Sequence, residues 1–150
     1  MKAATVKQLK DELNERSPKE LIGLCLRLSK FKKENKELLT YLLFEASDEL
    51  SYIQSVKEEI DEQFEQINRK KFYFIKKSVR KILSSTKKHI RYSQKKETEV
   101  ELLIYVCRKL KNLRPSIHRN TVLQNLYNRQ IGLIKKKILL YMKICSMIME

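Results

Sequence analysis

Residues 70–92 read KKFYFIKKSVRKILSSTKKHIRY and contain neither glycine nor proline. Their apolar side chains recur at spacings of three and four, which places them on one arc of an α-helix; these are Phe72, Ile75, Val79, Ile82, Leu83 and Ile90. Lysine and arginine fill most of the other positions. The stretch therefore predicts an amphipathic helix with an apolar side against a core and a basic side in solvent.

The rest of the chain has the same helical pattern. Only 2 glycines and 2 prolines occur in 150 residues, so the usual breaks between strands and tight turns are rare. Helices are expected over about 6–13, 18–31, a stretch through 38–44, 50–67, 70–92, 97–113 and from 116 almost to the end. We predict an all-α fold of about six to seven helices, as an irregular multi-helix bundle or a short stack of helical hairpins, in one domain over residues 1–150.

Two helix starts are marked by capping residues. Thr5 is placed to cap the first helix, and Ser17-Pro18-Lys19-Glu20 combines an N-cap serine, a proline at the first helical position and a glutamate suited to a capping box. The second and third helices carry apolar residues over most of their circumference, which is typical of helices buried on several sides. We therefore expect these two helices to form the centre of the fold.

The last apolar run, Ile138–Met149, is interrupted by Lys143 and reaches only about half of the ~20 residues that span a bilayer. We expect it to be the buried end of the last helix. The alternative, suggested by the adjacent Lys135-Lys136-Lys137, is an amphipathic helix lying on an anionic membrane.

Charge is distributed unevenly along the chain, whose formal net charge is +15. Residues 1–68 hold 11 Lys and Arg against 14 Asp and Glu, a net charge of −3, whereas residues 69–150 hold 22 against 4, a net charge of +18. Residues 69–96 contain 12 basic residues and no acid. Such a segment repels itself, and an anionic partner would remove the repulsion.

The candidate binding residues lie on the helix over 70–92. We expect its basic side to contact nucleic acid phosphates or another anion through Lys70, Lys77, Arg80, Lys81, Lys88 and Arg91. Tyr73 and Tyr92 on the same segment could stack on unpaired bases, although packing is the simpler role for them. No zinc-finger, RNP, KH or homeodomain pattern accompanies the charge, so any RNA or DNA binding is expected to be independent of sequence. A solvated surface, partly neutralised by acids of the helix over 50–67, is the alternative.

The sequence shows no pattern of catalytic or metal-ligating residues. His89 and His118 are far apart and form no H-x-x-x-H pair, and the two glycines are solitary, so neither a zinc motif nor a glycine-rich phosphate loop is present. We expect no catalytic residue, no metal and no cofactor. The 3 cysteines have no C-x-x-C spacing, and the first residues have no secretory pattern, so a cytoplasmic protein without a membrane span is expected.

Three segments, 24–39, 98–105 and 125–131, resemble an uncharacterised family of small bacterial all-helical proteins. They read LCLRLSKFKKENKELL, TEVELLIY and NLYNRQI. The resemblance spans most of the chain and implies a helical fold and a bacterial cytosolic origin, but no activity and no site residues.

These features together predict a non-enzymatic binding module with a basic helix face for nucleic acid phosphates. The alternative is a protein-interaction or scaffold domain that uses this face for an acidic partner, or its apolar helix surfaces for self-association.

Overall fold

The computed structural model describes residues 1–149, which form seven α-helices and no strand. The helices are α1 (Val6–Asn14), α2 (Pro18–Phe31), α3 (Lys33–Thr40), α4 (Glu49–Glu65), α5 (Phe72–Ser93), α6 (Lys96–Lys111) and α7 (Thr121–Met149). A π-helical turn, Tyr41–Glu45, follows α3, and a 3₁₀ turn, Ile117–Arg119, precedes α7. The prediction of an all-α fold of six to seven helices is confirmed.

Contacts within the chain define two compact units, Met1–Phe44 and Glu45–Glu150. Each unit is described by itself. The expectation that residues 1–150 make one domain stays a prediction.

The first unit contains α1, α2 and α3, and its helix starts follow the predicted caps. The Thr5 hydroxyl accepts from the Gln8 backbone N–H at 3.2 Å, while Gln8 Oε1 accepts from the Thr5 backbone N–H at 2.9 Å, which completes a capping box. Ser17 caps α2 by accepting from the Glu20 backbone N–H at 3.2 Å, with Pro18 at the first helical position. Local chemistry therefore sets both helix starts.

The expectation that α2 and α3 form the centre of the fold is wrong. Leu24, Leu26 and Leu28 are between 42 and 64% exposed, and the buried residues of the first unit are Ser29 and Tyr41. Helix α2 packs on α3, but two short helices cover only one side of each other. A helix with apolar residues around most of its circumference would be stabilised by burial on several sides. Whether other helices lie against those sides depends on the tertiary fold.

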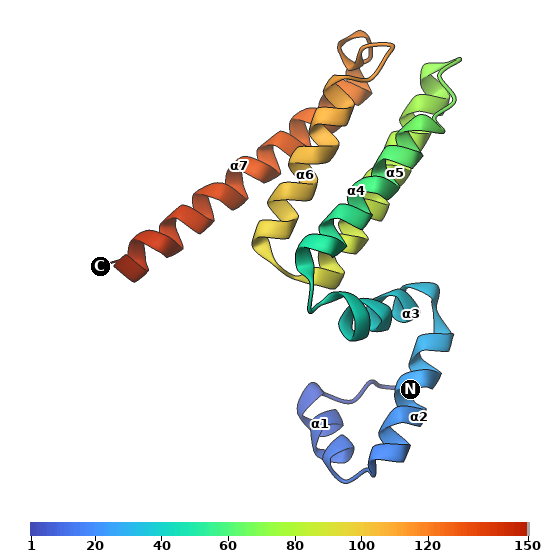
Figure 1. The fold of residues 1–150 in the computed structure, drawn as a ribbon, viewed down its shortest axis with the longest axis vertical. Coiled ribbons are helices and arrows are strands. Elements are labelled where there is room, and N and C mark those ends of the chain that lie inside the picture. Colours follow the sequence, from blue (N-terminus) through green and yellow to red (C-terminus); the bar gives the residue numbers. More distant parts are fainter. Residues whose placement is uncertain (150) are drawn as a thin grey trace. The chain divides into compact units, whose positions relative to one another are not determined.

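The second unit is an up-down-up-down arrangement of α4, α5, α6 and α7 (Figure 1). Helices α4, α5 and α6 pack on one another, and α7 packs on α6 before the two diverge towards the C-terminal end of α7 (Figure 1). The core lies among these helices and is built from aliphatic side chains, with Ile60, Ile75, Val79, Leu102, Leu110 and Leu123 almost fully buried. The apolar arc predicted for residues 70–92 supplies its part of this core.

Glu49 in the first turn of α4 holds the junction between α5 and α6. Its Oε1 accepts hydrogen bonds from the hydroxyls of Ser93 and Thr98, and its Oε2 lies 3.6 Å from Lys95 Nζ. Ser93 and Thr98 are both buried, so these contacts satisfy polar groups that would otherwise be costly. These contacts tie the end of α5 and the start of α6 to the start of α4.

A second set of contacts joins α4 to α6. The Tyr105 hydroxyl donates to Asp61 Oδ1 at 2.6 Å, and Lys109 Nζ lies 3.0 Å from the same oxygen. Burial raises the pKa of Asp61, but the hydrogen bonds from Tyr105 and Lys109 and the charge of Lys109 together lower it below the ordinary value. Burial and the same contact raise the pKa of Tyr105 to about 12.

The expectation that Ile138–Met149 is a buried helix end is also wrong. Most of its apolar side chains are exposed, including Leu139, Tyr141, Met142, Met147, Ile148 and Met149. The reason is that α7 leaves α6 along its second half, so no helix of this unit covers that end (Figure 1). Among residues 1–149, no helix is both long enough and apolar enough to cross a membrane.

Candidate nucleic-acid interface

Helix α5 has an apolar side and a basic side, as the sequence predicts. Its core-facing residues include Ile75, Val79, Ile82 and Leu83. Arg80, Lys87 and Arg91 are exposed, and they are spaced by seven and four residues, which places them in one row along the helix. The row spans about 16 Å at 1.5 Å per residue.

The basic row of α5 forms one wall of a groove whose other wall is α7. The groove has a volume of about 520 Å³. Its lining from α5 is Arg80, Leu83, Ser84, Lys87, Lys88 and Arg91, and its lining from α7 is Leu126, Arg129 and Gln130. We call these nine residues the basic groove. Five of them are cations, and no carboxylate is among the described residues that line it.

The groove contains three of the six residues predicted from the sequence, namely Arg80, Lys88 and Arg91. Lys77 and Lys81 are exposed on α5 but do not line the groove. Lys70 precedes α5 in the connection from α4, where its backbone N–H donates to Asn68 Oδ1 at 3.1 Å. Three of the six predicted binding residues therefore line the groove, and the other three lie outside it.

Lys87 and Arg129 are the groove cations that the sequence reasoning missed. Lys87 lies four residues before Arg91 and seven after Arg80, so its helical spacing was available as a signal. Arg129 had no such signal, because only the packing of α7 brings it beside α5. The absence of any acid between Thr121 and Met149 was the one hint that α7 shares the basic character of α5.

Charged residues of α4 pair with α6 as well as with α5. Asp61 pairs with Lys109 of α6, and Lys57 Nζ lies 2.9 Å from Glu101 Oε1 of α6. Glu59 Oε2 lies 3.0 Å from His89 Nε2 on α5. None of these acids lines the basic groove, whose charged lining residues are all cations.

Gln130 of α7 lines the groove and has 1% of its surface exposed. Its side-chain oxygen Oε1 is buried and has no hydrogen-bond donor among the described residues. A buried amide oxygen without a donor costs roughly 1–3 kcal/mol relative to a satisfied one. The groove wall therefore carries a polar group that the packing of this chain alone does not explain.

The two tyrosines of α5 have different surroundings. Tyr92 is 8% exposed, and its ring packs edge-on against His89 at 5.8 Å between centroids, so the idea that Tyr92 stacks on bases is wrong. Tyr73 is 63% exposed, and its ring lies edge-on to Phe74 at 5.4 Å. Tyr73 is near the start of α5 and outside the groove.

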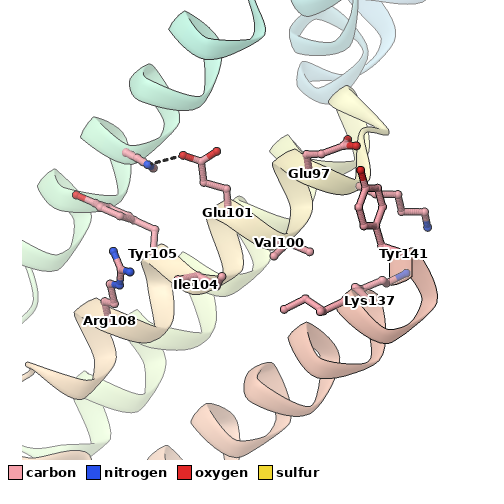
Figure 2. Close-up of a pocket in the computed structure, with 11 residues that line it drawn as sticks. Glu97, Val100, Glu101, Ile104, Tyr105, Arg108, Lys137 and Tyr141 are labelled. Atoms are coloured by element: carbon pink, nitrogen blue, oxygen red, sulfur yellow. Dashed lines mark hydrogen bonds and ion pairs between the residues drawn. The ribbon is translucent and has the colours of Figure 1, made fainter. Parts of the chain in front are cut away.

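A second cavity, of about 470 Å³, lies between α4, α6 and the diverging half of α7 (Figure 2). Val100, Ile104 and Ile138 give it an apolar lining, and the Tyr141 side chain of α7 stands across from Glu97 at the start of α6 (Figure 2). Its charged rim is mixed, with four cations and two carboxylates. Lys57 and Glu101 neutralise each other there at 2.9 Å, so this cavity lacks the single-sign character of the basic groove.

His89 is held by contacts within the chain. The His89 ring contacts Glu59, and the backbone oxygen of His89 accepts from the Tyr52 hydroxyl at 2.8 Å. Among residues 1–149, no group of three His, Cys, Asp or Glu side chains could hold a metal ion. Burial raises the pKa of the Cys107 thiol to about 11, which keeps it protonated and unreactive at neutral pH.

Comparison with known proteins identifies no relative. No family model, no curated protein and no solved structure matches the chain. The resemblance to a family of small bacterial helical proteins stays a prediction.

Proposed function

We propose that this protein is a non-enzymatic binding module that contacts nucleic acid phosphates through the basic groove between α5 and α7. The observation that carries the proposal is the convergence of Arg80, Lys87, Lys88, Arg91 and Arg129 from two helices on one groove without a carboxylate. A positively charged surface attracts a polyanion, and binding releases the counterions that were condensed on the phosphates.

The dimensions of the groove suit a phosphate backbone. Double-stranded DNA carries one charge per about 1.7 Å of helix axis, so the ~16 Å row from Arg80 to Arg91 lies alongside several phosphates. Lys77 and Lys81 extend the positive surface beyond the groove on the same helix. Arginine and lysine contacts of this kind bind the phosphate backbone of the nucleic acid and do not distinguish between bases. The expected binding is therefore independent of sequence.

Fluorescence anisotropy of labelled single-stranded and double-stranded RNA and DNA tests the proposal. The protein should bind at low ionic strength, and the logarithm of the association constant should fall linearly with the logarithm of the salt concentration. The slope should be about −0.9 per phosphate neutralised on duplex DNA and about −0.7 on single strands. Failure to bind any of the four nucleic acids at low salt would refute the proposal.

A protein-interaction function is the second candidate, and the first unit supports it. Ile22, Leu28 and Phe31 of α2 are each more than 60% exposed, and exposed apolar patches mark surfaces that bind other proteins or themselves. Sedimentation equilibrium separates the two candidates. A strict monomer that captures no protein partner would argue against this alternative, whereas a dimer that loses its self-association with Leu28→Glu and Phe31→Glu would support it.

A further inference from the structure

Tyr73 near the start of α5 is an exposed aromatic residue that phosphate contacts alone do not use. It is 63% exposed, and its ring contacts Phe74 edge-on with 5.4 Å between the centroids. This contact leaves most of the Tyr73 side chain open to solvent. Exposed aromatic rings beside a basic groove are typical of proteins that stack the bases of single-stranded nucleic acids.

The helical register places Tyr73 in line with the basic row of α5. Tyr73 precedes Arg80 by seven residues and Arg91 by 18, and both spacings are close to whole turns at about 3.6 residues per turn. Lys77 follows Tyr73 by four residues and precedes Arg80 by three, so it lies on the same side of the helix. The aromatic ring and the row of cations therefore share one side of α5.

Tyr73 lies beyond one end of the basic groove. Arg80 is the groove residue of α5 nearest to the start of the helix, and Tyr73 is about 10 Å further along the helix axis at 1.5 Å per residue. Lys77 is an exposed cation in this interval, and residues 69–96 contain no acid. A strand that leaves the groove at Arg80 would pass Lys77 and then meet the Tyr73 ring.

The ring adds a contact that a duplex cannot make. Phosphate contacts alone favour duplex DNA, because its charge density is higher and each neutralised phosphate contributes about −0.9 to the salt slope, against about −0.7 on single strands. Paired bases already stack on one another, so their faces are covered. Unpaired bases can stack on an aromatic side chain, and every base has a π-face that allows it.

We infer that the basic groove binds single-stranded RNA or DNA, with the backbone along Arg91, Lys87 and Arg80 and an unpaired base stacked on Tyr73. The inference rests on the proposed function, since it names the class of nucleic acid that the same groove binds. Lys77 contacts the phosphate beside the stacked base. The stacking energy depends little on which base is present, so binding remains independent of sequence.

Anisotropy titrations with three ligands of equal length test the inference. They are an oligothymidylate of about 16 nucleotides, an abasic strand with the same phosphates, and a duplex. Tyr73→Ala should weaken binding of the oligothymidylate about tenfold, because one base loses its stacking partner. The same variant should weaken binding of the abasic strand and of the duplex less than twofold.

Two further comparisons separate stacking from other effects of the substitution. Tyr73→Phe keeps an aromatic ring and should retain the affinity of the parent for all three ligands. An oligouridylate should lose as much affinity with Tyr73→Ala as the oligothymidylate does, because the ring contacts the base and not the sugar. Equal losses on the oligothymidylate and the abasic strand, or no loss on either, would overturn the inference.

Tryptophan fluorescence reports the stacking directly. The chain has no tryptophan, so Tyr73→Trp introduces a single reporter whose ring can still stack. Its emission should be quenched by the oligothymidylate and should stay unchanged with the abasic strand. Leu50→Trp is the control, since Leu50 of α4 is 80% exposed and does not line the groove. Quenching at both positions, or at neither, would contradict a base stacked on residue 73.

Failure of the inference and failure of the proposed function give different results. If the parent binds none of the ligands at low salt, the proposed function fails and the inference fails with it. If the parent binds all three ligands with a salt-dependent affinity and Tyr73→Ala changes none of them, the groove binds phosphates and the stacked base is refuted.

Discussion

Arg129 of α7 lines the same groove as Arg91 of α5, although 38 positions separate them in the sequence. Neither residue is part of a binding motif. The packing of the second unit brings Arg129 beside the cations of α5, and the two helices together form the groove. A polyanion in this groove would contact both helices at once. The binding free energy would then be the sum of several weak phosphate contacts.

The first prediction separates the groove from the rest of the basic side of α5. Lys87→Glu should weaken binding to duplex DNA and reduce the magnitude of the salt slope by about 1, because Lys87 lines the groove. Lys81→Glu is the matched control, since Lys81 is exposed on the same helix but lies outside the groove. It should have the smaller effect in the same anisotropy titration. If Lys81→Glu has the larger effect, the phosphates lie along the outer surface of α5 and not in the groove.

The second prediction concerns the buried amide of Gln130. Gln130→Met keeps a similar shape and removes an oxygen that has no hydrogen-bond donor among the described residues. The free energy of unfolding should rise by about 1 kcal/mol. Equilibrium urea denaturation measures this as a higher midpoint with an unchanged slope. A lower midpoint would show that the amide is satisfied in solution by a bound water.

The third prediction is a pH dependence of stability at the contact between α4 and α6. The pKa of Asp61 is lowered in the folded protein, so the ionised carboxylate stabilises the fold. That stabilisation is fully present above the ordinary aspartate pKa of 3.8 and is lost as the pH falls through the lower folded-state value.

Asp61→Asn should therefore reduce the free energy of unfolding at neutral pH, and the difference from the parent should disappear in acid. The reduction should be about 1 kcal/mol or less, because the Asp61 side chain is 36% exposed and solvent screens its charge. Urea denaturation at several pH values measures the effect. Asp11→Asn, at an exposed position of α1, is the control and should show no such trend. A destabilisation of Asp61→Asn that is the same at all pH values would mean that the carboxylate charge is not involved.

The fourth prediction uses the exposed Tyr73. Tyr73→Ala should leave stability nearly unchanged, because the ring is mostly in solvent. Tyr92→Ala should cost about 3 kcal/mol, because Tyr92 is buried. Thermal denaturation of the two variants compares them directly. Similar losses of stability at both positions would be inconsistent with the burial difference between the two ends of α5.

Local features of the fold could be predicted from the sequence because they depend on neighbouring residues. Thr5 and Ser17 cap α1 and α2 through contacts three residues along the chain, and Ile75 and Val79 face the core because their spacing matches the helical period. The basic side of α5 could be predicted from the same helical period, because the lysines and arginines occupy the positions between the apolar residues.

Features that depend on packing between distant segments could not be predicted in the same way. Leu28 of α2 and Ile148 of α7 have strongly apolar surroundings in the sequence, but both are exposed because no helix of their own unit covers them. Arg129 could not be assigned to the binding surface, since its position beside α5 depends on how α7 returns along α6. Periodicity identifies the side of a helix that gains from burial, and the tertiary fold decides which sides are covered.

The most direct test of the central claim is a salt series of duplex DNA binding, measured by anisotropy, for the parent and two double variants. Arg91→Glu with Arg129→Glu reverses one cation on each wall of the groove, and Lys7→Glu with Lys10→Glu makes the same charge change on the exposed surface of α1. We predict that the groove variant loses at least about tenfold in affinity at low salt and has a salt slope smaller in magnitude by about 2, while the α1 variant keeps the slope of the parent. Equal effects of the two variants would contradict the account, because binding would then reflect net charge and not the groove.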